Sequence, residues 1–305
     1  MRASLAFFVL CVLGAAACSD GPGGPGGSGG AGGGGTGGGG AGGAGGAGGA
    51  SGLPLPNRDG DDLDVGHYEH LLVGLVGDTR PALPGGTYPQ QIISHIFQEL
   101  DRRAPDFAIS LGDYIYVSPA NLNQATTQFG YYKQAQSGYR GAVYYVVGNH
   151  EGYGDNIVAF RQAMNPAAYF TLHGTVGTST FKFVIVADDV WTAQEESWLG
   201  AALARPTTYT FVCRHHPSYN TDATNRHIYA LIMAAHPTLL IDGHTHTYSR
   251  DLGLREVVIG NGGAAPLDGT YFGYATLDVR TDGTALVSSY RESDDSLRDS
   301  FTVAR

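Results

Sequence analysis

Lysine and cysteine are scarce in this chain of 305 residues, and each shortage excludes a class of function. Lysine occurs only at Lys133 and Lys182, and the net charge is −10. Because binding to a phosphate backbone depends on clustered Lys and Arg, we expect no nucleic-acid partner. Cys213 is the one cysteine beyond residue 18. The folded part therefore has no internal disulfide, and a thiolate-rich structural zinc site is excluded.

The first 17 residues have the pattern of a secretory signal peptide. Arg2 precedes an apolar run over residues 5–13, and small residues lead to Cys18. Such a run is too short to span a bilayer. The Ala-Ala-Cys ending resembles a bacterial lipobox with Cys18 as the lipidated residue, and plain signal cleavage is the alternative. We expect an exported protein, a bacterial cell-envelope lipoprotein in the periplasm or on the cell surface.

Glycine dominates from residue 21 to about residue 52. Glycine has no side chain to pack and loses the most entropy on ordering. We therefore predict a disordered Gly-rich tether over residues 18–65, with a low-complexity leader of no function as the alternative. Residues 66–305 then form one domain, long enough for one large core or two packed sheets.

Five short apolar runs organise this domain, and each is followed by a polar residue that can bind a metal. The runs cover residues 71–76, 107–111, 143–147, 209–213 and 239–241. Continuous runs of this length are typical of strands buried on both faces, and ligands gather beyond the carboxyl ends of such strands. The polar residues that follow them are Asp78, Asp113, Asn149 with His150, His215, and His244 with His246.

Helical patterns separate several of these runs. Pro89 is well placed to open a helix through about Arg103, and Thr192 with Glu195 forms a capping box for a helix through about Ala204. Residues 117–141 predict only a short helix and a surface loop, and residues 61–64 are assigned to the linker. The segment after residue 255 is rich in strand patterns. A mixed α/β fold with two sheets accounts for this order.

Carboxylate, imidazole and amide oxygen donors suit hard to borderline metal ions. Any one of these residues alone is equally well explained as a helix cap or a ligand of a backbone amide. Five of them arriving in order at strand ends favour a site for two metal ions.

The same residues resemble the five motifs of the calcineurin-like metallophosphoesterases, in the same order. Within that superfamily the sequence is most similar to the purple acid phosphatases: Arg80 stands where the first motif usually has a histidine, and Tyr116 stands where that family has an iron-binding tyrosine. The resemblance implies an αββα sandwich with a dinuclear metal site at the C-terminal ends of the strands. It also implies that residues 66–305 are the catalytic domain.

The resemblance assigns seven ligands to two metal ions. The first ion would be bound by Asp78, Tyr116 and His246, the second by Asn149, His215 and His244, and Asp113 would bridge them. The anionic donors of the first site favour Fe(III), and the second site suits Zn, Mn or Fe(II). Asp242 is expected to orient a ligating imidazole, and His216 to lie behind the ligands or at the surface.

The implied function is that of an acid-phosphatase-like enzyme acting on small phosphate monoesters. Metal-bound hydroxide would attack the phosphate, and His150 would protonate the leaving oxygen. Arg80 is a candidate for phosphate binding, with pairing to a carboxylate as the alternative. His227 is a candidate at the cleft rim, with an ordinary helical histidine as the alternative. A phosphodiesterase or nucleotide pyrophosphohydrolase on the same site, and a non-catalytic surface binding protein, are the competing functions.

Overall fold

The computed structural model describes residues 52–220, 222–267 and 270–305. The predicted signal peptide, Cys18 and most of the predicted tether lie outside these residues. Within the described ranges, the helices are all too short or too polar to cross a bilayer.

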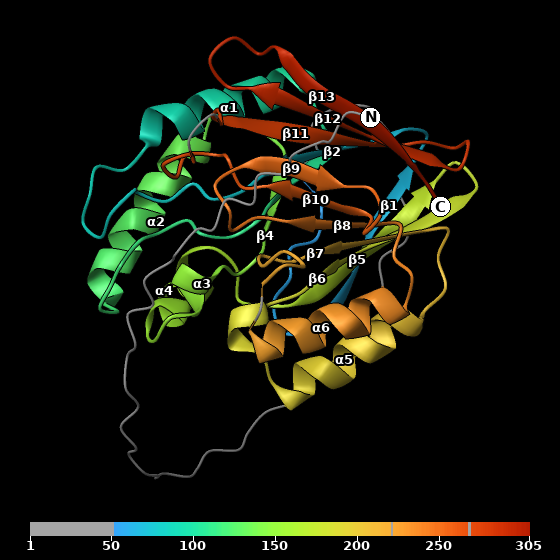
Figure 1. Ribbon diagram of the computed structural model, residues 1–305, viewed down its shortest axis with the longest axis horizontal. Coiled ribbons are helices and arrows are strands. Elements are labelled where there is room, and N and C mark those ends of the chain that lie inside the picture. The colour runs from blue at the N-terminus through green and yellow to red at the C-terminus, as the bar shows by residue number, and fades with distance from the viewer. Residues whose placement is uncertain (1–51, 221, 268–269) are drawn as a thin grey trace, which may run out of the picture. The chain divides into compact units, whose positions relative to one another are not determined.

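Two β-sheets face each other (Figure 1). The first, called sheet A, has the strand order β1 (Asp61–Tyr68), β5 (Phe170–Val176), β6 (Ser179–Ile185), β7 (Tyr209–Cys213), β8 (Leu239–Asp242), β10 (Glu256–Ile259) and β9 (Tyr248–Asp251). The second, called sheet B, has the order β13 (Leu297–Ala304), β12 (Thr284–Arg291), β11 (Gly273–Val279), β2 (Leu71–Val76), β3 (Phe107–Ser110) and β4 (Ala142–Tyr145).

Helices cover the outer face of each sheet, which confirms the predicted αββα layers. The helices α1 (Gln90–Arg103) and α2 (Leu122–Gln136) pack on sheet B, where Phe97 and Phe129 share a core cluster with Val143. The helices α5 (Ala193–Ala204) and α6 (Ala223–Ala234) pack on sheet A, where Leu199 and Ile232 join such a cluster. Three short helices lie in the loops: α3 (Asn149–Gly152), α4 (Asn156–Ala163) and η1 (Asp188–Val190).

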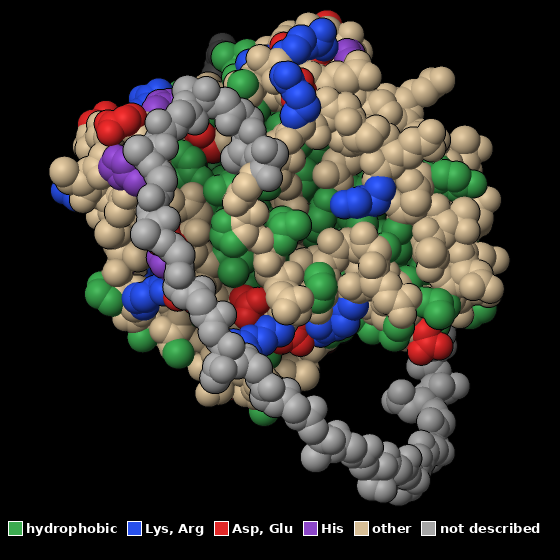
Figure 2. All heavy atoms as spheres, turned by 180° about the vertical axis from the view of Figure 1, so that it is seen from behind, with side chains coloured by type: hydrophobic (Ala, Val, Ile, Leu, Met, Phe, Trp, Pro, Cys, Tyr) green, Lys and Arg blue, Asp and Glu red, His purple; other side chains and the backbone are tan. Residues whose placement is uncertain are grey.

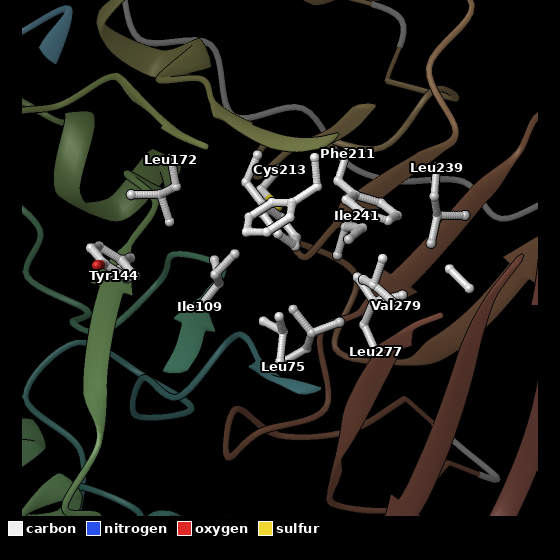
Figure 3. Close-up of a cluster of buried hydrophobic side chains, with 14 of the residues drawn as sticks. Leu75, Ile109, Tyr144, Leu172, Phe211, Cys213, Leu239, Ile241, Leu277 and Val279 are labelled. Carbon is white, nitrogen blue, oxygen red and sulfur yellow. The ribbon is translucent and has the colours of Figure 1, made fainter. Parts of the chain in front are cut away.

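The main core lies between the two sheets (Figure 3). Leu75 and Leu277 of sheet B meet Phe211 and Ile241 of sheet A there, and all four side chains are fully buried. Cys213 belongs to the same core as a free thiol. Burial raises the pKa of this thiol, so it acts as a small apolar side chain.

The five predicted strands divide between the sheets. In sheet B, β2, β3 and β4 are parallel neighbours, and α1 connects β2 to β3. In sheet A, β7 and β8 are parallel neighbours. The loops that leave these strands meet at one edge of the sandwich. There His215 contacts Leu111, and His244 contacts Asp78 and Asn149.

Two predictions of local structure are wrong, and two strands were not predicted. The folded part includes residues 61–65, which we assigned to the tether, because β1 pairs in parallel with β5 and turns Leu63 and Val65 towards the core. Its exposed acidic residues hide this pattern, although charge is typical of an edge strand. Residues 122–136 form a full helix whose apolar face, with Phe129 and Tyr132, is interrupted by Gln, Asn and Thr. The strands β9 and β13 were not predicted.

Basic side chains do not form a continuous patch on the face shown in Figure 2. Lys and Arg appear there as separate groups, and Asp and Glu lie beside several of them. This agrees with the small number of lysines in the sequence.

Candidate metal centre

Four of the predicted ligands have a left-handed backbone. The φ angles are 56° for Asp78, 57° for Asp113, 75° for His244 and 53° for His246. A residue with a Cβ atom loses about 1–3 kcal/mol in such a conformation, and the surrounding structure must impose it. Strain of this kind clusters at functional sites, and four of the eight non-glycine residues with positive φ in the described chain are predicted ligands.

The donor atoms of the second site converge on one point. Oδ1 of Asn149 lies 3.0 Å from Nε2 of His215 and 3.1 Å from Nδ1 of His244. The two imidazole nitrogens are 3.3 Å apart, and Oδ1 of Asp113 is also 3.3 Å from His215 Nε2. Donors at ~2.1 Å from a tetrahedral ion lie about 3.4 Å from each other. The donors of Asn149, His215 and His244 therefore have the mutual spacing that one divalent cation requires, and Oδ1 of Asp113 has that spacing to His215.

His215 is oriented from behind by a backbone group. Its Nδ1 lies 2.8 Å from the carbonyl oxygen of Leu111, which leaves Nε2 to face the other donors. Burial opposes a positive charge on this imidazole, yet the neighbouring carboxylate of Asp113 outweighs it and raises the pKa of His215. The point of convergence thus favours a positive charge, as a metal site requires.

The first site is built around Asp78 and Asp113, which are both buried. Oδ2 of Asp78 accepts the backbone N–H of His244 at 2.7 Å. Its Oδ1 is buried without a hydrogen-bond partner among the described residues and lies 3.8 Å from Nε2 of His246. Asp78, Asp113 and His215 each offer a donor atom within 4.8 Å of the others. A buried carboxylate oxygen left unpaired costs free energy, so this geometry also fits a cation.

Arg80 lies inside this first site. Its Nε donates to Oδ2 of Asp113 at 3.2 Å, and its Nη2 is 3.0 Å from Nε2 of His246. The guanidinium carbon lies 4.5 Å from the centre of the Tyr116 ring. The structure thus places Arg80 at a carboxylate, which is the alternative that we weighed against phosphate binding.

His150 and Tyr116 lie beside each other at the same centre. Their ring centres are 4.2 Å apart, in an edge-on arrangement. Nε2 of His150 is 3.7 Å from Oδ2 of Asp113, and its backbone N–H donates to Oδ1 of that residue. Burial lowers the pKa of His150 to about 4, against the opposing charge of Asp113. The ring is therefore placed where it can reach a group bound at the centre.

Glu151 is a functional residue whose role the sequence analysis did not recognise. Its carboxylate accepts backbone N–H groups from Asp113 at 2.8 Å, Tyr114 at 2.9 Å and Gly148 at 3.0 Å. Burial and the nearby charge of Asp113 raise its pKa to about 8. Glu151 fixes the loop of the bridging ligand to the loop of Asn149. Its position in the Gly-Asn-His-Glu sequence was the available signal.

Glycine at two positions allows the loops to approach this closely. A Cβ atom on Gly148 would lie 2.4 Å from the backbone nitrogen of Asp113, and one on Gly243 would lie 2.8 Å from Oδ2 of Asp78. Neither position can carry a side chain without moving a predicted ligand.

His216 lies behind the ligands, which is one of the two positions that we expected for it. Its ring is buried and lies 4.2 Å from the ring of His244, centre to centre. Its Nε2 is 3.0 Å from Oδ1 of Asp189, and its Nδ1 is 2.8 Å from the side-chain amide of Asn220. Both ring nitrogens are thus held by polar partners, which fixes the surface against which His244 packs.

Two other expectations differ from the structure. Asp242 does not hydrogen-bond a ligating imidazole among the described residues; it is buried near Arg214 and Glu256, and burial raises its pKa. We expected Asp242 at the ligands because it directly precedes Gly243 and His244. It is instead the last residue of β8. His227 lies half-exposed on α6, where its Nε2 is 3.1 Å from Glu196 of α5. That contact favours an ordinary helical histidine over a residue at the cleft rim.

The comparisons with known proteins agree with this geometry. The model of the calcineurin-like phosphoesterase family matches residues 71–248. A purple acid phosphatase from seeds of yellow lupin (Lupinus luteus) has a similar fold, with a TM-score of 0.59 and 18% identity over 83% of this chain. A dimetal phosphatase from Danio rerio has a TM-score of 0.55 and 12% identity over 77% of this chain.

The extent of these matches differs. The aligned part spans 55% of the lupin protein and 98% of the Danio rerio protein. No curated protein matches the sequence. At these identities the two structures show a shared fold, while the family model spans all five candidate motifs up to Tyr248.

Proposed function

The chain belongs to the calcineurin-like phosphoesterase family, and from this premise we propose that it hydrolyses phosphate monoesters of small molecules at a dinuclear metal centre. The observation that carries the proposal is the convergence of Asn149, His215, His244 and Asp113 on one point, with Asp78 and His246 beside it. A binding protein without catalysis has no need for this complete donor set.

Bound metal ions would supply an activated water and would stabilise charge on the phosphate oxygens. The residues of the chain then have separate tasks. Asp113 presents its two oxygens to both sites, since Oδ1 faces His215 and Oδ2 faces Arg80. Zinc, manganese or Fe(II) suits the neutral donors of the second site, and Fe(III) suits the first site once Tyr116 contributes its phenolate.

His150 is the proposed general acid, which gives a proton from Nε2 to the leaving oxygen. Because burial lowers its pKa to about 4, this role belongs to the acidic end of the pH range. Its backbone N–H is held by Asp113, and its ring is held against Tyr116. This fixed position at the centre meets the first requirement of an acid catalyst, which is reach. The side chain of His150 is only 16% exposed, which favours a small substrate over a protein substrate.

We further propose that the protein is exported and held to a bacterial membrane through a lipid on Cys18. Support comes from the signal pattern of residues 1–17 and the glycine-rich sequence that follows. Expression with a radiolabelled fatty acid tests this part. Label in the wild-type chain that is lost in Cys18→Ser supports the lipid anchor, and secretion without label favours plain signal cleavage.

Hydrolysis of nitrophenyl phosphate beside bis-nitrophenyl phosphate tests the catalytic proposal. The purified chain would be assayed from acidic to neutral pH, with Asp113→Asn as the blank. Faster turnover of the monoester, lost in the blank, is the expected result. Preference for the diester would move the function to a phosphodiesterase on the same site. Metal-loaded protein without activity on either substrate would favour a binding role.

A second comparison tests the role of His150. The variant His150→Ala is expected to lose turnover on phenyl phosphate, a poor leaving group, at least ~10-fold more than on nitrophenyl phosphate. Nitrophenolate needs little protonation, so an acid catalyst matters less for it. Equal losses on both substrates would reject the acid role.

A further inference from the structure

The guanidinium group of Arg80 contacts three of the four predicted ligands of the first site. Nε donates to Oδ2 of Asp113, Nη2 lies 3.0 Å from Nε2 of His246, and the ring of Tyr116 lies under the guanidinium carbon at 4.5 Å. The donors of the second site contact each other instead, at 3.0–3.3 Å. Arg80 thus contacts ligands of the first site, whereas the Asn149, His215 and His244 donors of the second site contact one another.

We propose that Arg80 is an internal cation that occupies the first metal position, so that the protein loads its two metal ions in a fixed order. The second site binds its ion first and tightly. The first site binds an ion only after the guanidinium has left Asp113 and His246. This inference rests on the proposed dinuclear centre, and it concerns the order and strength of loading rather than the reaction.

Competition for lone pairs is the physical basis of the proposal. An imidazole nitrogen that accepts a hydrogen bond from Arg80 has no second lone pair with which to bind a metal. The oxygen Oδ2 of Asp113, the natural bridging atom, is likewise engaged. Arginine stays protonated in proteins, so a change of pH does not release it.

Charge adds to this competition. The Arg80 side chain is only 11% exposed, so its positive charge is poorly screened from an incoming ion. The guanidinium also neutralises part of the negative charge of Asp78 and Asp113. That negative charge would attract a metal ion to the first site. To enter the first site, an ion must therefore displace the guanidinium from Asp113 and His246 and take the place of its positive charge.

The Asn149, His215 and His244 donors of the second site make no hydrogen bond to Arg80. Asn149 Oδ1, His215 Nε2 and His244 Nδ1 are close to the spacing that one tetrahedral ion requires, and Oδ1 of Asp113 completes the set. Asp113 thus gives one oxygen to Arg80 and the other to the second site. A single ion can bind without any movement of Arg80.

Metal content and stepwise affinity test the proposal without an activity assay. The full chain would be freed of metal with a chelator and titrated with Zn²⁺ by calorimetry, and the metal retained after gel filtration would be counted by mass spectrometry. Arg80→Gln keeps hydrogen-bonding capacity but removes the charge. Arg140→Gln is the matched control, because Arg140 is 81% exposed and pairs with Asp101, which is not one of the site residues.

The wild-type chain and Arg140→Gln are expected to retain one equivalent of zinc and to bind a second at least ~10-fold more weakly. In Arg80→Gln the second affinity is expected to rise about 10- to 100-fold, because two charge-assisted hydrogen bonds no longer compete. Arg80→Lys, which keeps the charge, is expected to behave like the wild type. A thermal melt of each variant confirms that it is folded.

Other outcomes overturn the inference. Two equivalents of equal affinity in the wild type, or an unchanged second affinity in Arg80→Gln, would show that Arg80 does not compete with an ion. Failure of every variant to retain zinc or iron would overturn the proposed metal centre itself. The two failures are thus distinguishable in one experiment.

Discussion

The carboxylate of Glu151, in the loop of Asn149, accepts the backbone N–H of Asp113 in the preceding ligand loop at 2.8 Å. The same oxygen, Oε2, accepts the N–H of Gly148 at 3.0 Å, and Oε1 accepts the N–H of Tyr114 at 2.9 Å and that of Ile115 at 3.2 Å. Four buried donors thus end on one side chain that does not itself face the metal position. The strained φ of Asp113 is held by these contacts.

Removal of this carboxylate is expected to weaken both the fold and the metal centre. Glu151→Ala leaves four buried N–H groups without their acceptor and should lower the free energy of unfolding by about 3 kcal/mol or more. Glu151→Gln keeps one acceptor oxygen and should lose less stability. Urea unfolding measures the first quantity, and a metal titration should show a 10- to 100-fold weaker affinity in both variants.

The exposed Glu69 provides the control for this series. Its side chain is 91% exposed, so Glu69→Gln should leave both stability and metal affinity within error of the wild type. A Glu151→Ala variant as stable as this control would mean that water or a backbone shift satisfies the four donors. The role assigned to Glu151 would then be wrong.

The buried strands and the ligands that follow them could be predicted because each motif is local. An apolar run such as residues 107–111 defines a strand, and Asp113 follows it within two residues. The strand β1 could not be found in this way, because its stability comes from pairing with β5, more than a hundred residues later. Its alternation of Asp with Leu63 and Val65 is hidden by the neighbouring acidic residues.

The contacts that support the site could not be predicted from the sequence either. Arg80 and His246 are separated by 166 positions, yet their nitrogen atoms lie 3.0 Å apart. Thr192 caps α5 as predicted, with its hydroxyl oxygen accepting the N–H of Glu195 at 3.2 Å. The reciprocal half of that capping box differs, because the Glu195 carboxylate accepts the N–H of Ala187 instead. A tertiary contact with Ala187 thus replaces the local hydrogen bond that the capping box predicts for the Glu195 carboxylate.

His216 gives a prediction about metal affinity through packing. The variant His216→Ala removes the ring that lies 4.2 Å from the ring of His244 and should let that ligand move. We expect metal affinity to fall about 10-fold, as for other groups that orient ligands. The variant Asp189→Asn keeps the His216 ring and weakens only the contact of residue 189 with His216 Nε2. It should give a smaller loss of metal affinity. An unchanged affinity in His216→Ala would show that His244 is held by other contacts.

Metal binding is expected to stabilise the folded chain strongly. Asp78 and Asp113 are buried next to each other, and the charge of Asp113 adds to burial in raising the pKa of Asp78. A cation relieves this repulsion, and an ion present at 100 times its dissociation constant adds about 2.7 kcal/mol of stability. Calorimetric melting with and without a chelator measures the difference. Asp113→Asn should melt at nearly the same temperature in both conditions; a large chelator effect in that variant would place the stabilising ion elsewhere.

Glu195 gives a prediction about stability and pH that is independent of the metal centre. The residue is buried, its Oε1 accepts the N–H of Ala187 at 2.8 Å, and its Oε2 has no hydrogen-bond partner among the described residues. Burial raises its pKa from 4.5 to about 9. A carboxyl group with a raised folded-state pKa is fully compatible with folding below pH 4.5, and its contribution is lost as the pH rises from 4.5 to 9. The neutral variant Glu195→Gln does not titrate.

The difference in free energy of unfolding between Glu195→Gln and the wild type should therefore grow in favour of the variant across this window. A gain on the order of a few kcal/mol by pH 9 is expected. Urea unfolding at several pH values measures it, and the difference curve cancels the titration of all other groups. Glu196→Gln, at the next position and 44% exposed, should run parallel to the wild type. A Glu195→Gln curve that also ran parallel would show that the buried carboxyl group is ionised in the folded protein, held by the N–H of Ala187 and by the first turn of α5.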